Sequence, residues 1–466
     1  MSGAYELARG APEMNKVRNM LASPSPSTDH ANTFIERLAL QSLSTGAVRC
    51  LSSLVTEWNF FLSILCLLAS AAYALILLTY TKHFFWDVDF YAAVVRAMNL
   101  GHSPYDNAWL MSDPSSAYSN GFVYPPAIAL LFDHIQWIFI SHSGRALLIC
   151  FLFLSWLAIP YFLAGRPKRP ISKDYLWIWS LYLALFGFAG VRLLAVGNIA
   201  ALLFAALTIT IGIAIERRDY RPFWIVLLIC SFIKPYFLGF LIFPAALDRQ
   251  YWQSALLVAS LASLYATNYF LEPQLFTEYL AQLSAQQSHL SNIGISFFTL
   301  ASSITRLLIK APSLSTAISI VIHLWFVAVI FLISIAVTGR TNRSRRFDSL
   351  CCWLFLSGFL ISPRLFDYDL ALIAVPFALL VRDLVVRRQS GAGVAIAMAS
   401  VSLFFTRIPA GIPLQLSDWS PTFLIAGIWL GTAVDFLASD SNAEQCPQCG
   451  LVPLDCSPTA PQVSAR

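Results

Sequence analysis

Apolar runs about as long as a membrane is thick recur along this chain, and they limit its possible folds more than any other feature. A helix needs roughly 17–25 mostly apolar residues to cross a hydrocarbon core of about 30 Å. The candidate spans cover residues 59–80, 145–164, 175–192, 197–215, 252–271, 315–338, 348–363, 369–382, 392–407 and 421–438. They predict an all-α, polytopic membrane protein with about 10–12 transmembrane helices.

The composition agrees with lipid as the solvent. The 466 residues are 58% hydrophobic and 12% charged, and the mean hydropathy is +0.66, whereas soluble domains are about 45–50% apolar and about 25% charged. The net charge of +5 comes from short basic clusters between the apolar runs. Because the positive-inside rule explains such clusters, the charge does not indicate nucleic acid as a partner.

Two segments do not fit a simple series of spans. The apolar segment 221–247 is long for one span and is interrupted at Lys234-Pro235. Since proline breaks a helix, we predict two short helices that enter the membrane from one side and return to it. Residues 127–140 are few and of mixed polarity, which favours an interfacial helix over a span.

These two assignments fix the orientation of the chain. With the N-terminus in the cytoplasm, four basic clusters become cytoplasmic, as the positive-inside rule requires. They are Arg166/Lys168/Arg169/Lys173, Arg217/Arg218/Arg221, Arg340/Arg343/Arg345/Arg346 and Arg382/Arg387/Arg388. Both termini are then cytoplasmic, and the expected location is the inner (plasma) membrane of a bacterium.

The predicted organisation has three parts. Residues 1–55 are polar, carry Ser and Pro, and lack the features of a signal peptide, so we expect a disordered cytoplasmic tail. Residues 56–440 form the transmembrane domain, in which residues 81–144 are the first extracytoplasmic loop. Residues 441–466 form a second disordered cytoplasmic tail.

The loop 81–144 is long and rich in polar and aromatic motifs, which is typical of functional loops. Near its start, Asp87 and Tyr91 lie at helical spacing, so we expect a helix on the membrane surface that ends at Gly101. The carboxylate of Asp87 suits an N-cap and a catalytic role about equally well. Asp89 is equally compatible with a solvated surface charge.

Five short motifs together resemble a known family. They are DVDFYAAVVRAMNLGHSPYD at 87–106, YPP at 124–126, GN at 197–198, IKP at 233–235 and SPRLFDYD at 362–369. In this order and at these separations they resemble the GT-C superfamily of polyprenyl-phosphate-sugar glycosyltransferases. The resemblance covers about residues 55–440 and is greatest to glycosyltransferase family 87, a mannosyltransferase-like group long labelled as a domain of unknown function.

This resemblance implies a GT-C-like fold and a hexosyltransferase activity. The enzyme would transfer a hexose, mannose by family likeness, from a polyprenyl-phosphate-linked donor to a glycan or glycolipid acceptor on the extracytoplasmic side. It also implies that Asp87 is the catalytic base, with Asp89 as the second candidate. The chain departs from the family at Asn198, where Gln is usual, and at Arg364-Leu365-Phe366, where an aromatic or His pair is usual.

Sugar transfer from a lipid phosphate also needs cations that stabilise the departing phosphate. Arg364, Lys234 and Arg192 are the candidates. A lysine within an apolar stretch is costly, which favours a functional role for Lys234. For Arg192 the pattern slightly favours a side chain that only reaches the membrane interface. Arg364 suits an ion pair with Asp367 or Asp369 as well as it suits a phosphate. We assign to the substrate pocket Tyr91, Tyr105, Tyr124, Asn198 and Asp367.

We predict no metal site and no cofactor, although a divalent cation bound together with the donor phosphate remains open. The C-terminal thiols of Cys446, Cys449 and Cys456 would bind zinc only with a fourth ligand, so reduced thiols in a tail are the favoured interpretation. The alternative to an enzyme is a transporter or flippase of a lipid-linked sugar, which would also place charges at membrane depth.

Overall fold

In the computed structural model, the structure describes residues 61–79, 84–113, 121–163, 173–288, 296–341, 343–387 and 420–444. The predicted tail 1–55, the predicted span 392–407 and the three C-terminal cysteines lie outside these residues. The chain divides into two units, Met1–Leu62 and Ser63–Arg466, and the description below concerns the second. Its described elements are all helical, which confirms the predicted all-α class.

Within the described ranges, seven helices are long and apolar enough to cross a membrane, so the chain is a membrane-spanning protein. They are Phe61–Thr79, α7 (His142–Leu163), α8 (Lys173–Val196), α9 (Ala200–Arg217), α12 (Tyr251–Leu271), α15 (Pro312–Arg340) and α19 (Ser420–Glu444). Each contains most of a predicted span. The predicted spans 348–363 and 369–382 correspond to two further helices, α16 (Arg343–Leu360) and α17 (Ala371–Arg387).

The predicted hairpin in segment 221–247 is confirmed. Its elements are α10 (Arg221–Ile233), the 3-10 helix η1 (Pro235–Leu241) and α11 (Ile242–Asp248). The hydroxyl of Tyr220 donates a hydrogen bond to Asp248 Oδ2 at 2.6 Å, so the two ends of the hairpin meet. The chain therefore turns back on itself within the bundle, and Lys234 lies at the turning point.

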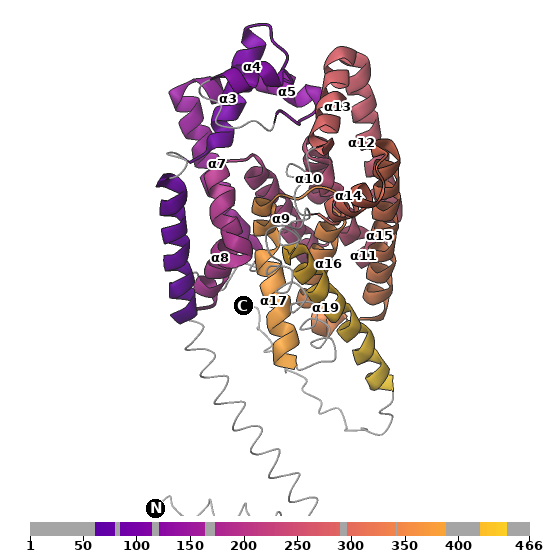
Figure 1. The fold of residues 1–466 in the computed structure, drawn as a ribbon. Coiled ribbons are helices and arrows are strands. Elements are labelled where there is room, and N and C mark those ends of the chain that lie inside the picture. Colours follow the sequence, from indigo (N-terminus) through magenta and orange to yellow (C-terminus); the bar gives the residue numbers. More distant parts are fainter. Residues whose placement is uncertain are drawn as a thin grey trace, which may run out of the picture. The chain divides into compact units, whose positions relative to one another are not determined.

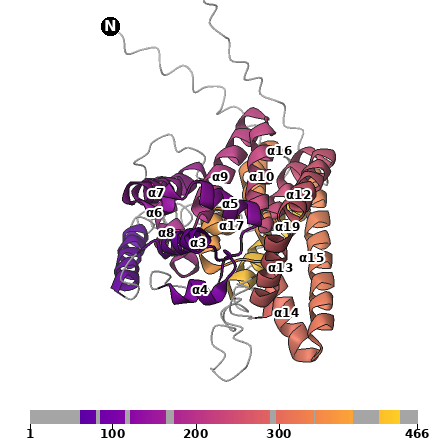
Figure 2. The ribbon, with the colours of Figure 1, turned by 90° about the horizontal axis from the view of Figure 1, so that it is seen from above.

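The segment between the first two spans folds into short helices that lie at one end of the bundle (Figures 1 and 2). They are α3 (Trp86–Asn99), α4 (Asn107–Ser112), α5 (Pro126–His134) and α6 (Trp137–Ile140). The helix α3 covers the residues of the predicted surface helix, and Gly101 follows it in a left-handed conformation (φ +82°). The helix does not lie open on a surface, because half of its residues, among them Val88 and residues 92–95, are buried where it packs against α5 and α6. Neither α5 nor α6 is long enough to cross a membrane, so residues 127–140 form no span.

The helices α12 and α13 (Pro273–Ser288) contact this segment, and α14 (Phe297–Leu308) follows α13 along the chain. Ala127 donates its backbone N–H to Asn268 Oδ1 of α12 at 2.9 Å, and Asn107 Nδ2 donates to Gln282 Oε1 of α13 at 2.6 Å. The aromatic ring of Tyr279 on α13 packs against Tyr105. These contacts hold the segment over the turning point of the hairpin.

A close backbone contact brings the loop after α16 to the same place. A Cβ atom at Gly239 in η1 would lie 2.2 Å from the carbonyl oxygen of Gly358 in α16, so only glycine permits this approach. Just beyond, Ser362 Oγ donates to the carbonyl oxygen of Tyr236 at 3.1 Å. The second 3-10 helix, η3 (Asp367–Leu370), therefore starts beside the hairpin turn.

The helix α8 contains a break that the sequence did not predict. Leu185 has an extended conformation, and Phe186, Gly187 and Phe188 are left-handed. Phe186 packs on Phe377 of α17, and Phe188 stacks on Tyr73 of the first span at 4.6 Å between ring centroids. Aromatic contacts with two other helices thus accompany a backbone conformation that is costly for non-glycine residues.

Candidate functional site

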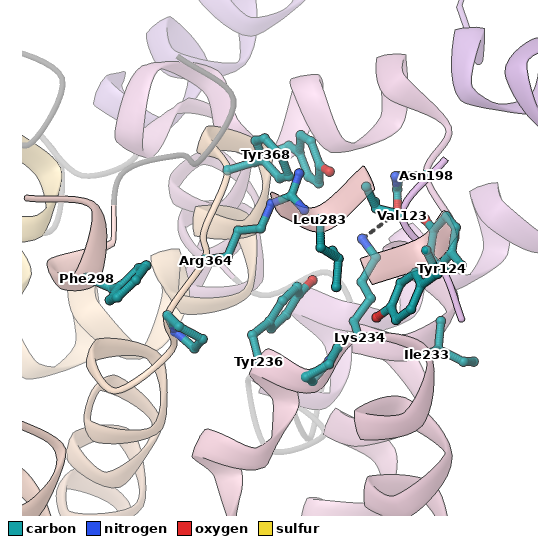
Figure 3. A pocket seen from close by; sticks show the side chains of 14 residues that line it. Val123, Tyr124, Asn198, Ile233, Lys234, Tyr236, Leu283, Phe298, Arg364 and Tyr368 are labelled. Atoms are coloured by element: carbon teal, nitrogen blue, oxygen red, sulfur yellow. Dashed lines mark hydrogen bonds between the residues drawn. The ribbon is translucent and has the colours of Figure 1, made fainter. Parts of the chain in front are cut away.

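A cavity of about 260 Å³ lies at the turn of the hairpin (Figure 3). Its wall consists mostly of aromatic and aliphatic side chains and carries two cationic side chains and one amide. The lining residues are Val123, Tyr124, Asn198, Ile233, Lys234, Pro235, Tyr236, Tyr279, Leu283, Phe298, Pro363, Arg364, Phe366 and Tyr368. They come from the segment before α5, the turn before α9, the hairpin, α13, α14 and the loop after α16, so six separate parts of the chain build one pocket.

Lys234 lies at the centre of this pocket because the helix α10 stops there. Its backbone is extended (φ −139°, ψ 100°), since the following Pro235 disfavours the helical conformation. The side chain is only 9% exposed, and Nζ donates to Asn198 Oδ1 at 2.9 Å (Figure 3). Nζ also lies 5.7–5.9 Å from the ring centroids of Tyr124, Tyr236 and Tyr368. Three aromatic faces and one amide oxygen thus stabilise the buried ammonium.

Asn198 reaches the pocket through a turn that requires glycine. Gly197 is left-handed (φ +68°), and a Cβ there would lie 2.7 Å from Phe85 Cα. The N–H of Phe85 donates to the carbonyl oxygen of Ala195 at 2.6 Å, so the start of α3 is fixed against the end of α8. This approach places Asn198 beside Asp87, and Asn198 Nδ2 donates to Asp87 Oδ2 at 2.5 Å.

Asp87 is not the N-cap of α3. The N-cap is Phe85, in a left-handed conformation, and no side chain caps the helix. Burial raises the pKa of the Asp87 carboxyl from 3.8 to about 6, although the hydrogen bond from Asn198 and the charge of Lys234 both oppose the increase. The side chain is partly exposed and does not itself line the cavity; it contacts the wall through Asn198.

The three tyrosines predicted for the pocket form one group. Tyr124 lines the cavity, and its hydroxyl lies 3.0 Å from the hydroxyl of the buried Tyr91. Tyr105 donates its hydroxyl to the carbonyl oxygen of Tyr124 at 2.7 Å. Tyr91 and Tyr105 therefore support Tyr124 from behind and do not line the cavity themselves.

The loop after α16 contributes Arg364, whose guanidinium lies 4.7 Å from the ring centroid of Phe366. The fully buried Asp369 accepts the hydroxyl of Tyr236 at 3.2 Å and the backbone N–H of Phe366 at 2.9 Å. Asp369 thereby fixes the loop that carries Arg364. The predicted pocket residue Asp367 begins η3, and its side chain lies outside the described parts of the structure.

Two other predicted residues lie away from the cavity. Asp89 forms an ion pair with Arg145 at the start of α7. Arg192 on α8 donates Nε to the hydroxyl of Tyr73 in the first span at 2.8 Å. The structure thus brings together Asp87, Asn198 and Lys234, with Arg364 in the same pocket, and gives Asp89 and Arg192 contacts between helices.

Several lining residues were not predicted, among them Tyr236, Tyr279, Phe298 and Tyr368. Tyr368 lies within the motif SPRLFDYD, and Tyr236 directly follows the motif IKP, so their position in the sequence could have indicated them. Tyr279 and Phe298 lie in segments without a motif. No group of three His, Cys, Asp or Glu side chains suited to a metal ion occurs in the part of the chain that the structure describes.

Comparison with known proteins gives no relative. No family model matches the chain, and no curated protein and no solved structure matches it.

Proposed function

We propose that this protein is a membrane glycosyltransferase. It transfers a hexose, with mannose as the first candidate, from a polyprenyl-phosphate-linked donor to a glycan or glycolipid acceptor on the extracytoplasmic side. The observation that carries the proposal is the hydrogen-bonded series Asp87, Asn198, Lys234. It connects a carboxylate with a raised pKa to a cationic, aromatic pocket at a break in a membrane hairpin. The resemblance of five sequence motifs to GT-C enzymes supports the same activity.

The pocket suits a sugar phosphate. Lys234 and Arg364 both line it, and cations stabilise the negative charge that develops on a departing phosphate. The apolar faces of a sugar ring pack well on aromatic side chains, which Tyr124, Tyr236 and Tyr368 supply. The lipid-linked sugar would therefore occupy the cavity with its phosphate near the two cations.

Asp87 supplies the base for the acceptor. In the proposed reaction the acceptor oxygen forms a bond to the anomeric carbon, the bond from that carbon to the phosphate oxygen breaks, and the phosphate keeps the electron pair. The acceptor proton moves to the carboxylate of Asp87. Because Asp87 is partly exposed and touches the cavity wall at Asn198, the acceptor approaches from outside the pocket that holds the donor.

The test uses purified protein in proteoliposomes with radiolabelled polyprenyl-phosphate mannose and envelope lipids. We expect label to move to a new glycan or glycolipid, and the Asp87→Asn variant to abolish this movement. A panel of polyprenyl-phosphate hexoses covers other sugars. If no donor in the panel is consumed, or if Asp87→Asn transfers label as fast as the wild type, the proposal is wrong.

Two interrupted helical segments favour a transporter or flippase of a lipid-linked sugar as the second candidate. The hairpin is interrupted at Lys234 and α8 at Leu185–Phe188, and discontinuous membrane helices often form transport sites. Under this alternative the labelled donor crosses the bilayer with its sugar–phosphate bond intact. Movement of intact donor in the proteoliposomes, unchanged by Asp87→Asn, would favour it over the enzyme.

A further inference from the structure

The amide of Asn198 lies between two charged side chains of opposite sign. Its Nδ2 donates to the carboxylate of Asp87 at 2.5 Å, and its Oδ1 accepts from the ammonium of Lys234 at 2.9 Å. Oδ1 also accepts the backbone N–H of Ala200 at 2.8 Å. The residue itself is only 5% exposed. The amide is thus a buried bridge between an anion and a cation.

The chemistry of these partners allows only one orientation of the amide. An ammonium and a backbone N–H are donors without an acceptor function, so both require the carbonyl oxygen of Asn198. An ionised carboxylate only accepts hydrogen bonds, so it requires the amide nitrogen. A rotated amide would place donors against donors and oxygen against oxygen. Asn198 therefore presents its positive end to Asp87 and its negative end to Lys234.

The same amide keeps the two charges from direct contact. Among the described residues, no ion pair joins Asp87 to Lys234, and both are bonded to Asn198 instead. A direct pair would favour the ionised carboxylate strongly and make it a weaker base. It would also engage the ammonium that the pocket otherwise offers to an anion.

We propose that Asn198 is a positioning residue that orients Asp87 and Lys234 while holding them apart, so that the carboxylate stays available to a proton and the ammonium to a phosphate. The roles of proton acceptor and phosphate ligand rest on the proposed glycosyl transfer. The separation of the two charges rests only on the geometry.

In the described parts of the chain, few other ionisable groups act on Asp87. Tyr91 of its own helix, Tyr124 and Tyr368 lie near enough to interact with it electrostatically. Their phenol groups stay neutral below about pH 10. Asp89 on the same helix is paired with Arg145. Burial is the largest influence on the pKa of Asp87, and Asn198 and Lys234 are the described neighbours that oppose it near neutral pH.

The test measures the protonation of Asp87 directly, without turnover. Infrared difference spectra of the full chain in nanodiscs, each referenced to the same protein with Asp87→Asn, follow the carboxylic acid band against pH. In Asn198→Ala the hydrogen bond that lowers the pKa of Asp87 is lost, but Lys234 can approach and pair with the carboxylate directly. An opposite charge in contact lowers a carboxyl pKa by about 1–3 units, which is more than one hydrogen bond does, so we expect a net fall of about one unit or more. In Asn198→Asp a second carboxylate stands beside Asp87, so the upper pKa of the pair should rise by at least about one unit.

Asn268→Asp is the matched control. Asn268 is also a buried asparagine, at 7% exposed, but it bonds the N–H of Ala127 and lies on α12. Its replacement should leave the Asp87 titration within about half a unit of wild type. Shifts of the same sign in both Asn198 variants, no shift in either, or an equal shift in the control would overturn the proposal.

Folding of each variant is checked by its melting temperature. If Asn198→Ala does not fold, Asn198→Gln replaces it, because glutamine keeps the amide group. The pKa of Asp87 should then stay within about half a unit of the wild-type value in Asn198→Gln and rise in Asn198→Asp. A rise of similar size in both would overturn the proposal. Because these titrations use no donor, their result is independent of the transfer assay. If the pKa of Asp87 shifts in opposite directions in the two Asn198 variants but no sugar is transferred, only the glycosyltransferase proposal is refuted. If sugar is transferred but the pKa does not shift, only the role of Asn198 is refuted.

Discussion

Replacing Asp87 by asparagine, and changing the pH at which the intact enzyme works, test the same carboxylate in two ways. Asparagine has nearly the same shape and can still accept the hydrogen bond from Asn198, but it cannot take a proton from an acceptor. A positioned general base contributes about 10²–10⁴-fold to a rate. We therefore expect Asp87→Asn to lower kcat by at least about a hundredfold, with little change in donor KM.

The pH dependence follows from the raised pKa of Asp87. With a pKa of about 6, the carboxylate is about 90% ionised at pH 7 and about 10% ionised at pH 5, so transfer should fall about tenfold between these values. With the ordinary value of 3.8, more than about 90% would remain ionised at pH 5 and the rate would hardly change. The sign is that of a base: activity rises with pH through about 6.

The assay follows radiolabel from the lipid-linked donor into acceptor at matched donor concentrations, from pH 4.5 to 8. Asp89→Asn is the matched control, because Asp89 is two residues away on the same helix and pairs with Arg145. An ion pair near the surface contributes about 1 kcal/mol or less to stability, so this variant should lose less than about threefold in transfer. Equal losses in both variants, or a rate independent of pH between 5 and 7, would refute the reasoning.

Three further predictions concern the same site. The pKa of Asp87 is raised from 3.8 to about 6, so ionising this carboxyl destabilises the folded state by up to about 3 kcal/mol. This destabilisation is complete above about pH 6 and absent below about pH 4. The Asp87→Asn variant should therefore melt at a higher temperature than the wild type at pH 7.5 and at the same temperature at pH 4. Lys234→Met should raise the donor KM at least about tenfold, since a hydrogen bond to a charged group contributes about 1.5–3 kcal/mol, and an unchanged KM would exclude Lys234 from donor binding. Gly197→Ala should destabilise the protein by about 1–2 kcal/mol or more, because an alanine there must adopt a left-handed conformation and its Cβ contacts Phe85. Gly212→Ala is the control. A Cβ at Gly212 meets no atom within 4 Å, so this variant should not lower the melting temperature.

The sequence by itself determined the membrane class, the positions of most spans and the hairpin. Hydropathy over about 20 residues is a local property, and lipid enforces it because every unpaired backbone group in hydrocarbon is costly. The break at Lys234-Pro235 was equally local, since proline lacks the N–H and disfavours a helical residue before it. In the structure the chain turns back at this break, and the two ends of the segment meet at Tyr220 and Asp248.

The break in α8 was not predictable in the same way. Nothing in the local pattern around Gly187 interrupts the apolar run, and the run reads as one span. The left-handed residues beside it pack their rings on Phe377 and Tyr73, which lie far away in the chain. Only the packing of three helices decides such a conformation.

Which polar residues meet was likewise decided by tertiary structure. Asp87 and Asp89 are two residues apart and similar in sequence context, yet one bonds Asn198 and the other Arg145. Arg192 was also a candidate for a phosphate ligand, but it bonds Tyr73 of the first span. The direction of a side chain depends on the rotation of its helix and on the partners that it meets. Such partners can lie more than a hundred residues away in the chain, as Asn198 does from Asp87. Neither hydropathy nor spacing along the chain contains that information.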